Sequence, residues 1–177
     1  MNHRRTLAAE PAPLVSFDAR DYRNALGTFA TGVTIITARD RAGRLAGLTV
    51  NSFSSVSLDP PLVLWSQSRA APSLRIFQEA AHFVVNVLAA DQEELSRRFA
   101  RPHEDKFAGV EHAVAECGAP VIAGSAAHFE CRNEYRHYGG DHVIFIGHVE
   151  RYAYTPGKPT LMFCHGRYVR GQPVEAG

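Results

Sequence analysis

Residues 47–65, GLTVNSFSSVSLDPPLVLW, are the stretch that decides the fold. Apolar residues alternate with polar ones, which is typical of a half-buried β-strand, but most of the polar residues carry small hydroxyl or amide groups. Such side chains beside free backbone N–H groups can form a neutral cradle for a phosphate or the edge of a heterocycle. They can equally form the solvent face of an ordinary strand, with Asp59-Pro60-Pro61 as a plain turn. The pattern alone leaves both interpretations open.

Further strands are predicted on both sides of this stretch. Residues 33–38 form a strand that connects through a turn at Gly43 to residue 47, so residues 32–58 are expected to form a hairpin. The remaining β-rich segments are residues 62–68, 82–88, 127–138, 142–154 and 161–169, with Gly139-Gly140-Asp141 as the turn between the two longest.

Three helices are predicted, one before these strands and two between them. Asp18 can cap a helix with an apolar stripe of Tyr22, Leu26 and Phe29, and that stripe needs a surface to pack on. A second helix follows Pro72, a residue suited to a first helical turn. Asp91 and Glu94 have the spacing of a capping box, which predicts a third helix over residues 92–100.

Six or more strands with two or three helices, in no regular βαβ alternation, favour an antiparallel barrel or sandwich decorated by helices. Residues 1–16 are expected to form a flexible N-terminal arm, and residues 17–177 a single domain. The chain has no GxGxxG sequence between a strand and a helix and no Walker sequence. A nucleotide would therefore bind in another way.

Composition excludes several classes of function. The 177 residues include 19 basic and 18 acidic side chains, for a net charge of +1, so no charged field attracts nucleic acid or an anionic membrane. No segment approaches the roughly 18 apolar residues of a membrane span, and the N-terminus lacks a signal-peptide core. A cytoplasmic location is expected, and Cys117, Cys131 and Cys164 suit a reducing compartment.

Two kinds of catalytic site are also disfavoured. The nine histidines are scattered over separate strands without an HxxxH spacing, so no metal site is expected, and no GxSxG sequence indicates a serine hydrolase. His142 differs because it follows Gly140-Asp141 at the start of a strand, where a turn can expose a side chain to a pocket. A satisfied turn histidine explains the same pattern equally well.

Several segments, in order, resemble the short-chain flavin reductases, which include the reductase components of two-component flavin-dependent monooxygenases. They are FATGVTIIT (29–37), residues 47–65, FVVNVLAADQEELSRRFA (83–100), DKF (105–107), HFEC (128–131), GGDHVIFIGHV (139–149) and HGRY (165–168). The resemblance covers about residues 20–170. It implies a mostly β, antiparallel, Greek-key-like split β-barrel of the FMN-binding type with peripheral helices, and a homodimer.

The resemblance also implies a set of cofactor-binding residues. Thr49, Val50, Asn51 and Ser52 would line the isoalloxazine edge, and Ser54 and Ser55 would lie toward the ribityl phosphate. The cradle would be completed by Thr31, Gly32, Val33, Thr34, Ser66, Gln67, Ser68, Phe83 and Asn86, with Lys106 near the flavin tail and Tyr168 near the cofactor. His142 matches a histidine associated with the nicotinamide, and we expect it to position that ring rather than to transfer protons.

The implied activity is an NAD(P)H:flavin oxidoreductase that transfers a hydride to FMN or FAD and supplies reduced flavin to a separate monooxygenase. The sequence does not choose between FMN and FAD, or between NADH and NADPH. Two alternatives stay open. The flavin could remain tightly bound and pass electrons to another acceptor such as a corrinoid, or the chain could be a flavin-binding split-barrel module without turnover.

Overall fold

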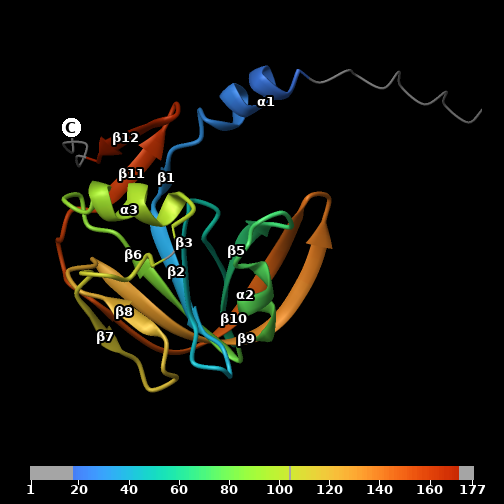
Figure 1. Ribbon diagram of the computed structural model, residues 1–177. Coiled ribbons are helices and arrows are strands. Elements are labelled where there is room, and N and C mark those ends of the chain that lie inside the picture. Colours follow the sequence, from blue (N-terminus) through green and yellow to red (C-terminus); the bar gives the residue numbers. More distant parts are fainter. Residues whose placement is uncertain (1–17, 104, 172–177) are drawn as a thin grey trace, which may run out of the picture.

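The computed structural model describes residues 18–103 and 105–171 of the chain (Figure 1). The arm predicted over residues 1–16 lies outside the described residues, as do the last six residues of the predicted domain. Within the described ranges, no helix is long and apolar enough to cross a lipid bilayer.

A seven-stranded antiparallel sheet forms the body of the molecule, with the strand order β3-β2-β6-β9-β10-β5-β4. The strands span Thr34–Arg39 (β2), Leu45–Val50 (β3), Ser54–Leu58 (β4), Pro61–Ser68 (β5), His82–Val87 (β6), Ala127–Gly139 (β9) and His142–Tyr154 (β10). The long β9–β10 hairpin curves around the body in Figure 1. Every strand connection in this sheet is antiparallel, as the sequence predicts.

The decisive stretch is divided between the two edges of this sheet. The hairpin predicted over residues 32–58 ends at Val50, because residues 51–53 leave the β3 ladder and β4 pairs with β5 instead. Phe53 turns inward in this break and packs against Phe129, with 5.7 Å between ring centroids. Ser52 accepts a hydrogen bond from Ser66 N at 2.9 Å and donates one to Ser66 O at 3.1 Å. Since β3 and β5 are not neighbours in the ladder, this contact draws the two edges of the sheet together.

Aromatic side chains fill the main core. Trp65 is fully buried and stacks on Phe145 with 4.4 Å between centroids, and Phe77 and Phe83 meet its ring edge-on. Such pairs contribute about 0.5–1.5 kcal/mol each beyond the area that they bury. Phe77 belongs to α2 (Leu74–Glu79), so this cluster holds the helix on the sheet. Pro72 was expected in the first turn, but α2 begins after Ser73 and Pro72 precedes the helix.

A second cluster joins α3 (Glu93–Ala100) to a small three-stranded sheet of β1 (Thr31–Gly32), β11 (Leu161–Cys164) and β12 (Arg167–Arg170). The segment predicted as one strand over residues 161–169 is thus a hairpin. The chain reverses at His165 and Gly166, where φ is 49° and 73°, a region that glycine adopts without strain. A third, two-stranded sheet pairs β7 (His112–Val114) with β8 (Pro120–Ile122).

The N-terminal ends of α1 and α3 show whether the caps predicted for these helices form. Asp18 caps α1 (Ala19–Leu26) by accepting hydrogen bonds from the N–H groups of Arg20 and Asp21, which confirms that prediction. The capping box predicted at α3 is wrong: Gln92 precedes the helix, and its side chain binds Ala89 N and Ala123 O instead of the first turn.

Much of the apolar stripe of α1 is exposed. Tyr22, Leu26 and Phe29 are 52%, 57% and 78% exposed, and the helix buries none of its residues. Figure 1 shows α1 projecting from the body beyond β1 and β11. Leu26 and Phe29 therefore keep most of their side-chain surface exposed within residues 18–103 and 105–171.

Candidate functional site

Small polar residues gather where the edges of the large sheet meet. Ser52 and Ser66 are joined by the two hydrogen bonds described above, and Asn51 next to them is exposed. Ser68 lies two residues further along β5, directly opposite His142 on β10. Since Gln67 points into the core between them, Ser66 and Ser68 face the other side of the strand. The structure thus brings together Ser52, Ser66, Ser68 and His142.

Ser54 and Ser55 lie on the edge strand β4, and both are exposed. The Ser54 hydroxyl donates only to the neighbouring Ser55 carbonyl, at 3.2 Å. Its second lone pair and the Ser55 hydroxyl face no described acceptor or donor, so both side chains are accessible to a ligand.

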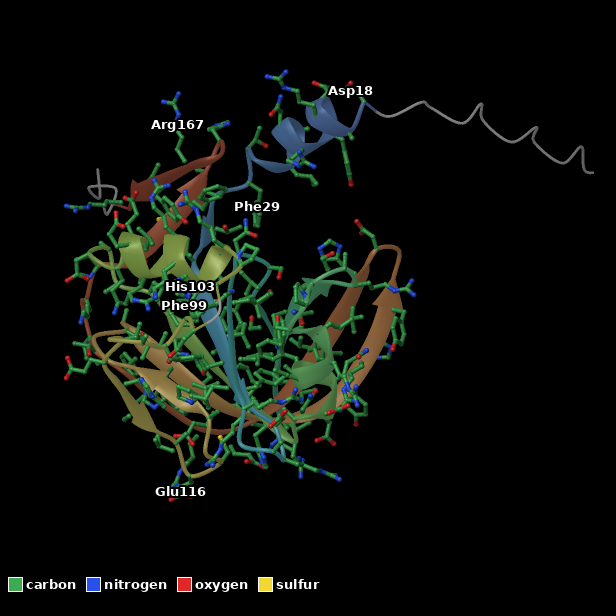
Figure 2. All side chains as sticks on the ribbon, viewed as in Figure 1. Asp18, Phe29, Phe99, His103, Glu116 and Arg167 are labelled. Atoms are coloured by element: carbon green, nitrogen blue, oxygen red, sulfur yellow. The ribbon has the colours of Figure 1, made fainter. Side chains whose placement is uncertain are left out.

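A cavity of about 620 Å³ lies between β3, the start of α2 and the segment that follows α3. Its size is within the range of sites that hold small molecules and cofactors. Figure 2 places Phe99 and His103 close together below α3, and both line this cavity. The lining residues are Leu45, Ala46, Gly47, Leu48, Thr49, Ala71, Pro72, Ser73, Ile76, Phe99, Ala100, Arg101, Pro102, His103, Asp105, Lys106 and Phe107.

Gly47 explains how α3 comes so close to β3. A Cβ atom at this position would approach Cε1 of Phe99 to 2.5 Å, well inside van der Waals contact. Glycine therefore lets the ring of Phe99 lie directly on the strand, and Phe107 meets that ring edge-on at 5.1 Å. The two rings form the apolar end of the cavity.

Lys106 is held against both walls of the cavity. Its Nζ donates to Phe99 O at 2.8 Å and to Gly47 O at 3.2 Å. Burial lowers the pKa of this half-buried amine, because removing an ammonium group from water disfavours its charged form. Among the described residues, no carboxylate forms an ion pair with it.

Ser96 in α3 is hydrogen-bonded to both Thr49 and Tyr168. The Thr49 hydroxyl donates to Ser96 O at 2.6 Å, and the hydroxyls of Ser96 and Tyr168 are hydrogen-bonded at 2.8 Å. The guanidinium group of Arg97 lies over the Tyr168 ring, 4.9 Å from its centroid. These contacts fix α3 between β3 and the closing hairpin, so Tyr168 supports the wall of the cavity.

The predicted residues of segment 31–34 lie on β1 and at the start of β2, the strand that pairs with β3. The buried hydroxyl of Thr34 donates to Val50 O at 3.1 Å, and Val33 and Val50 belong to the cores. Thr31 Oγ1 is buried without a hydrogen-bond partner in the described chain, and Gly32 beside it is exposed. Of these residues, Thr31 and Gly32 are the ones with groups left for a ligand.

Three of the predicted cofactor-binding residues have buried side chains. Phe83, Asn86 and Gln67 are at most 1% exposed, and their side chains are enclosed by the core. Asn86 donates to Ile35 O and Thr37 Oγ1 and accepts from Ile122 N, so both of its N–H donors and its oxygen are engaged within the core. Inward-facing positions of a strand alternate with outward ones, and a resemblance between segments does not distinguish residues that contact a ligand from those that support the strand.

Sequence reasoning missed several lining residues. Ser73, Phe99, Arg101 and Phe107 were not singled out, although all four line the cavity. The amphipathic pattern of α3 identifies Phe99 as a buried residue, but only the tertiary approach permitted by Gly47 brings it to the cavity. Segments 71–76 and 99–107 are separated by β6 in sequence, so no local pattern joins them.

His142 begins β10 and is exposed. Its Nδ1 lies 2.8 Å from Asp141 Oδ1, and the hydrogen bond from His142 holds the pKa of the Asp141 carboxyl below its ordinary value. A carboxylate at Nδ1 favours the tautomer that carries its proton there, which leaves Nε2 to meet a ligand. Among the described residues, no group of three or more His, Cys, Asp or Glu side chains is arranged to hold a metal ion.

Comparison with known proteins identifies the family of this chain. Residues 26–172 match the family model described as flavin reductase like domain. FMN reductase (NADH) SmoA of Agrobacterium fabrum is 48% identical over 153 residues, which cover 86% of each protein. The reductase subunit HsaB of a flavin-dependent monooxygenase from Rhodococcus jostii is 38% identical, over 89% of this chain and 80% of that protein. The chain spans about half the length of some other curated relatives.

A solved structure shows the same architecture. Streptomyces globisporus NADH:FAD oxidoreductase SgcE6, in complex with NAD and FAD fragments, matches with a TM-score of 0.84 and 40% identity, over 92% of this chain and 98% of that one. The chain belongs to the flavin reductase-like domain family. The resemblance drawn from its segments and the expected split β-barrel are both confirmed.

Proposed function

We propose that this chain is an NADH:flavin oxidoreductase that reduces FMN or FAD and releases the reduced flavin to a separate monooxygenase. The observation that carries the proposal is the cavity lined by residues 45–49 of β3 and by Lys106; the polar residues Asn51 and Ser52 follow the same strand outside the lining. SmoA and SgcE6 are described as NADH-dependent, and this supports NADH as the electron donor. NADH is a cytoplasmic metabolite, so the cytoplasm is the proposed site of action.

The residues present suit a flavin. The cavity has largely apolar walls that suit a planar ring, and the exposed amide of Asn51, which follows β3, offers hydrogen bonds without added charge. Ser54 and Ser55 would meet the ribityl phosphate. When bound, the flavin accepts a hydride at N5, so the protein has to hold and orient two substrates rather than supply a nucleophile.

His142 is proposed to position the nicotinamide. The Asp141 carboxylate fixes its ring orientation, and Nε2 would be the atom that meets the nicotinamide amide. Ser68, opposite His142 in the ladder, places this histidine beside the Ser52–Ser66 cradle. The nicotinamide would therefore approach the flavin from the β5–β10 side.

We also propose that two copies of the chain associate. Apolar and aromatic side chains are exposed in three places: on α1, on the edge strand β4 and on the β9–β10 hairpin. They include Leu26, Phe29, Val56, Leu58, Tyr135, Tyr138, Tyr152 and Tyr154. Exposed apolar patches mark interaction sites in soluble proteins, and the β9–β10 hairpin carries four of these exposed tyrosines. Light scattering during size-exclusion chromatography tests this proposal: twice the chain mass supports a homodimer, and the single-chain mass refutes it.

Steady-state kinetics test the proposed reaction. NADH oxidation should saturate with added FMN or FAD, with the flavin behaving as a second substrate that dissociates after each turnover. A rate that is independent of added flavin in a protein purified with bound flavin would support a prosthetic group instead, and would contradict release to a monooxygenase.

A further inference from the structure

A second cavity, of about 380 Å³, lies between the β7–β8 hairpin and the start of β9. It is lined by residues 111–113, 121–125 and His128, and it shares no described lining residue with the larger cavity beside β3. None of these residues belongs to the flavin cradle or to the nicotinamide contact proposed above. The volume is within the range of small-molecule sites, so this cavity has room for a ligand of its own.

Two buried amide side chains fix the wall of this second cavity. Asn86 accepts a hydrogen bond from Ile122 N at 2.9 Å, and Gln92 donates to Ala123 O at 2.8 Å. Ala123 N in turn donates to Glu111 O at 3.0 Å, which joins the two lining segments. The cavity is therefore bounded by backbone that the core holds in place.

His112 supplies a hydrogen-bond acceptor at this cavity. Its Nδ1 lies 2.8 Å from Val110 O, and because a carbonyl oxygen only accepts, the ring proton is on Nδ1. Nε2 of the neutral ring then carries a lone pair. The edge contact with Phe107, at 5.6 Å between ring centroids, holds the imidazole from a second side. Nε2 has no donor among the described residues, so it is the ring atom left for a ligand.

Ser125 adds a second polar group to the same cavity. Its buried hydroxyl has no hydrogen-bond partner among the residues that the structure describes. Buried hydroxyls are nearly always satisfied, so an unpaired one in a cavity wall points to a partner from outside the protein. A serine hydroxyl donates and accepts, and rotation about one bond turns it toward a ligand.

The described lining residues disfavour an ionic ligand. No lysine or arginine is among them, and the exposed Glu111 repels an anion. The apolar walls at Ala113 and Val121 make the burial of an organic cation costly. A metal ion is disfavoured too, because no group of three His, Cys, Asp or Glu side chains is arranged to hold one within the described ranges. A neutral ligand with a hydrogen-bond donor fits these walls best.

We propose that this second cavity binds a small uncharged alcohol or phenol. The hydroxyl of the ligand donates to His112 Nε2, and its apolar body packs on Val121 and Ile122. The site adjoins the proposed flavin cavity, because Phe107 lines that cavity and contacts the His112 ring. Binding here does not depend on the proposed function.

Four probes that share a phenyl ring test the chemistry of the ligand. Phenol carries the O–H donor, anisole lacks it, benzylamine is a cation and benzoate is an anion. Each is titrated into the full chain with and without excess FMN, which reveals by competition any binding in the larger cavity. Nitrogen-15 NMR of the histidine rings reports the ligand directly, because a hydrogen bond to Nε2 of His112 shifts that nitrogen.

Three variants locate the contact. His112→Phe keeps an aromatic ring beside Phe107 but removes the acceptor, and Ser125→Ala removes the second polar group. His137→Phe, at an exposed histidine of β9, is the matched control. We expect phenol to bind the wild type about three- to tenfold more tightly than anisole, and His112→Phe to lose about the same factor for phenol. His137→Phe should bind phenol like the wild type.

Equal affinities for phenol and anisole would overturn the proposal, as would an unshifted His112 Nε2 at millimolar phenol. Tighter binding of benzylamine or benzoate than of phenol would make the site ionic and refute it. If thermal unfolding shows that His112→Phe does not fold, Ser125→Ala and the ratio of phenol to anisole affinity decide the matter. If NADH oxidation fails while phenol binds as expected, the proposed function falls and this site stands.

Discussion

Ser52 binds both backbone groups of Ser66, through its hydroxyl, and so connects the end of β3 to β5 across the closing edge of the barrel. In the strand order of the large sheet, four strands lie between β3 and β5, namely β2, β6, β9 and β10. One side chain therefore contributes to closing the barrel and to shaping the polar cradle at the same point.

Replacement of Ser52 by alanine should destabilise the fold. Two hydrogen bonds of about 0.5–1.5 kcal/mol each are lost, so the free energy of unfolding should fall by about 1–3 kcal/mol. Urea denaturation measures the change. Ser54→Ala is the control, because its hydrogen bond joins neighbouring residues of one strand and should cost under about 0.5 kcal/mol. Similar stability of the two variants would show that the Ser52 contact does not hold the edges together.

Removal of both β4 hydroxyls, in Ser54→Ala with Ser55→Ala, should weaken the binding of FMN. Each lost charge-assisted bond to the phosphate is worth about 1.5–3 kcal/mol, so the dissociation constant should rise by at least tenfold. Quenching of flavin fluorescence gives the dissociation constant. Riboflavin lacks the phosphate and is the internal control: if its affinity falls as far as that of FMN, the phosphate lies elsewhere.

His142→Ala should slow flavin reduction by NADH about tenfold or more while changing flavin affinity by less than twofold. The reason is that His142 is proposed to orient the nicotinamide and does not line the cavity. Single-turnover reduction rates and flavin titrations measure the two quantities. His137→Ala, at an exposed histidine of the same hairpin, is the matched control. Parallel losses of rate and flavin affinity would contradict the positioning role.

Asn86→Ala should reduce stability rather than alter a ligand contact. The amide makes three buried hydrogen bonds, and alanine would leave Ile122 N without its partner in the core. Unsatisfied buried groups cost about 1–3 kcal/mol each, so we expect a loss of about 3 kcal/mol in the free energy of unfolding. Denaturation and FMN titration of the folded variant check this. A stable variant with weak flavin binding would restore the cofactor contact that the sequence suggested.

The sequence predicts the strands of the barrel well because their patterns are local. The alternation in residues 62–68 matches the inward positions of Val63, Trp65 and Gln67, and the turn at Gly140 matches the β9–β10 hairpin. The pattern fails at residues 51–53, where the chain leaves one edge of the sheet for the other. That change depends on Ser52 meeting Ser66, a contact that strand periodicity does not encode.

The candidate site is predictable in part for the same reason. The hydroxyl-rich stretch identifies Ser52, Ser54 and Ser55, but it does not show that Ser52 is the one that binds Ser66 on β5. The cavity depends on Gly47 admitting Phe99 and on Lys106 binding two segments that are distant in sequence. These are tertiary relationships, so they emerge only from the folded chain.

Anaerobic stopped-flow tests the central claim most directly. The protein is mixed with FMN or FAD and then with NADH or NADPH, while flavin absorbance near 450 nm is followed and a trap captures flavin that dissociates. We predict rapid bleaching with NADH and capture of the reduced flavin by the trap. Flavin that binds without bleaching, with either nucleotide, would contradict the assignment of this chain as a flavin reductase.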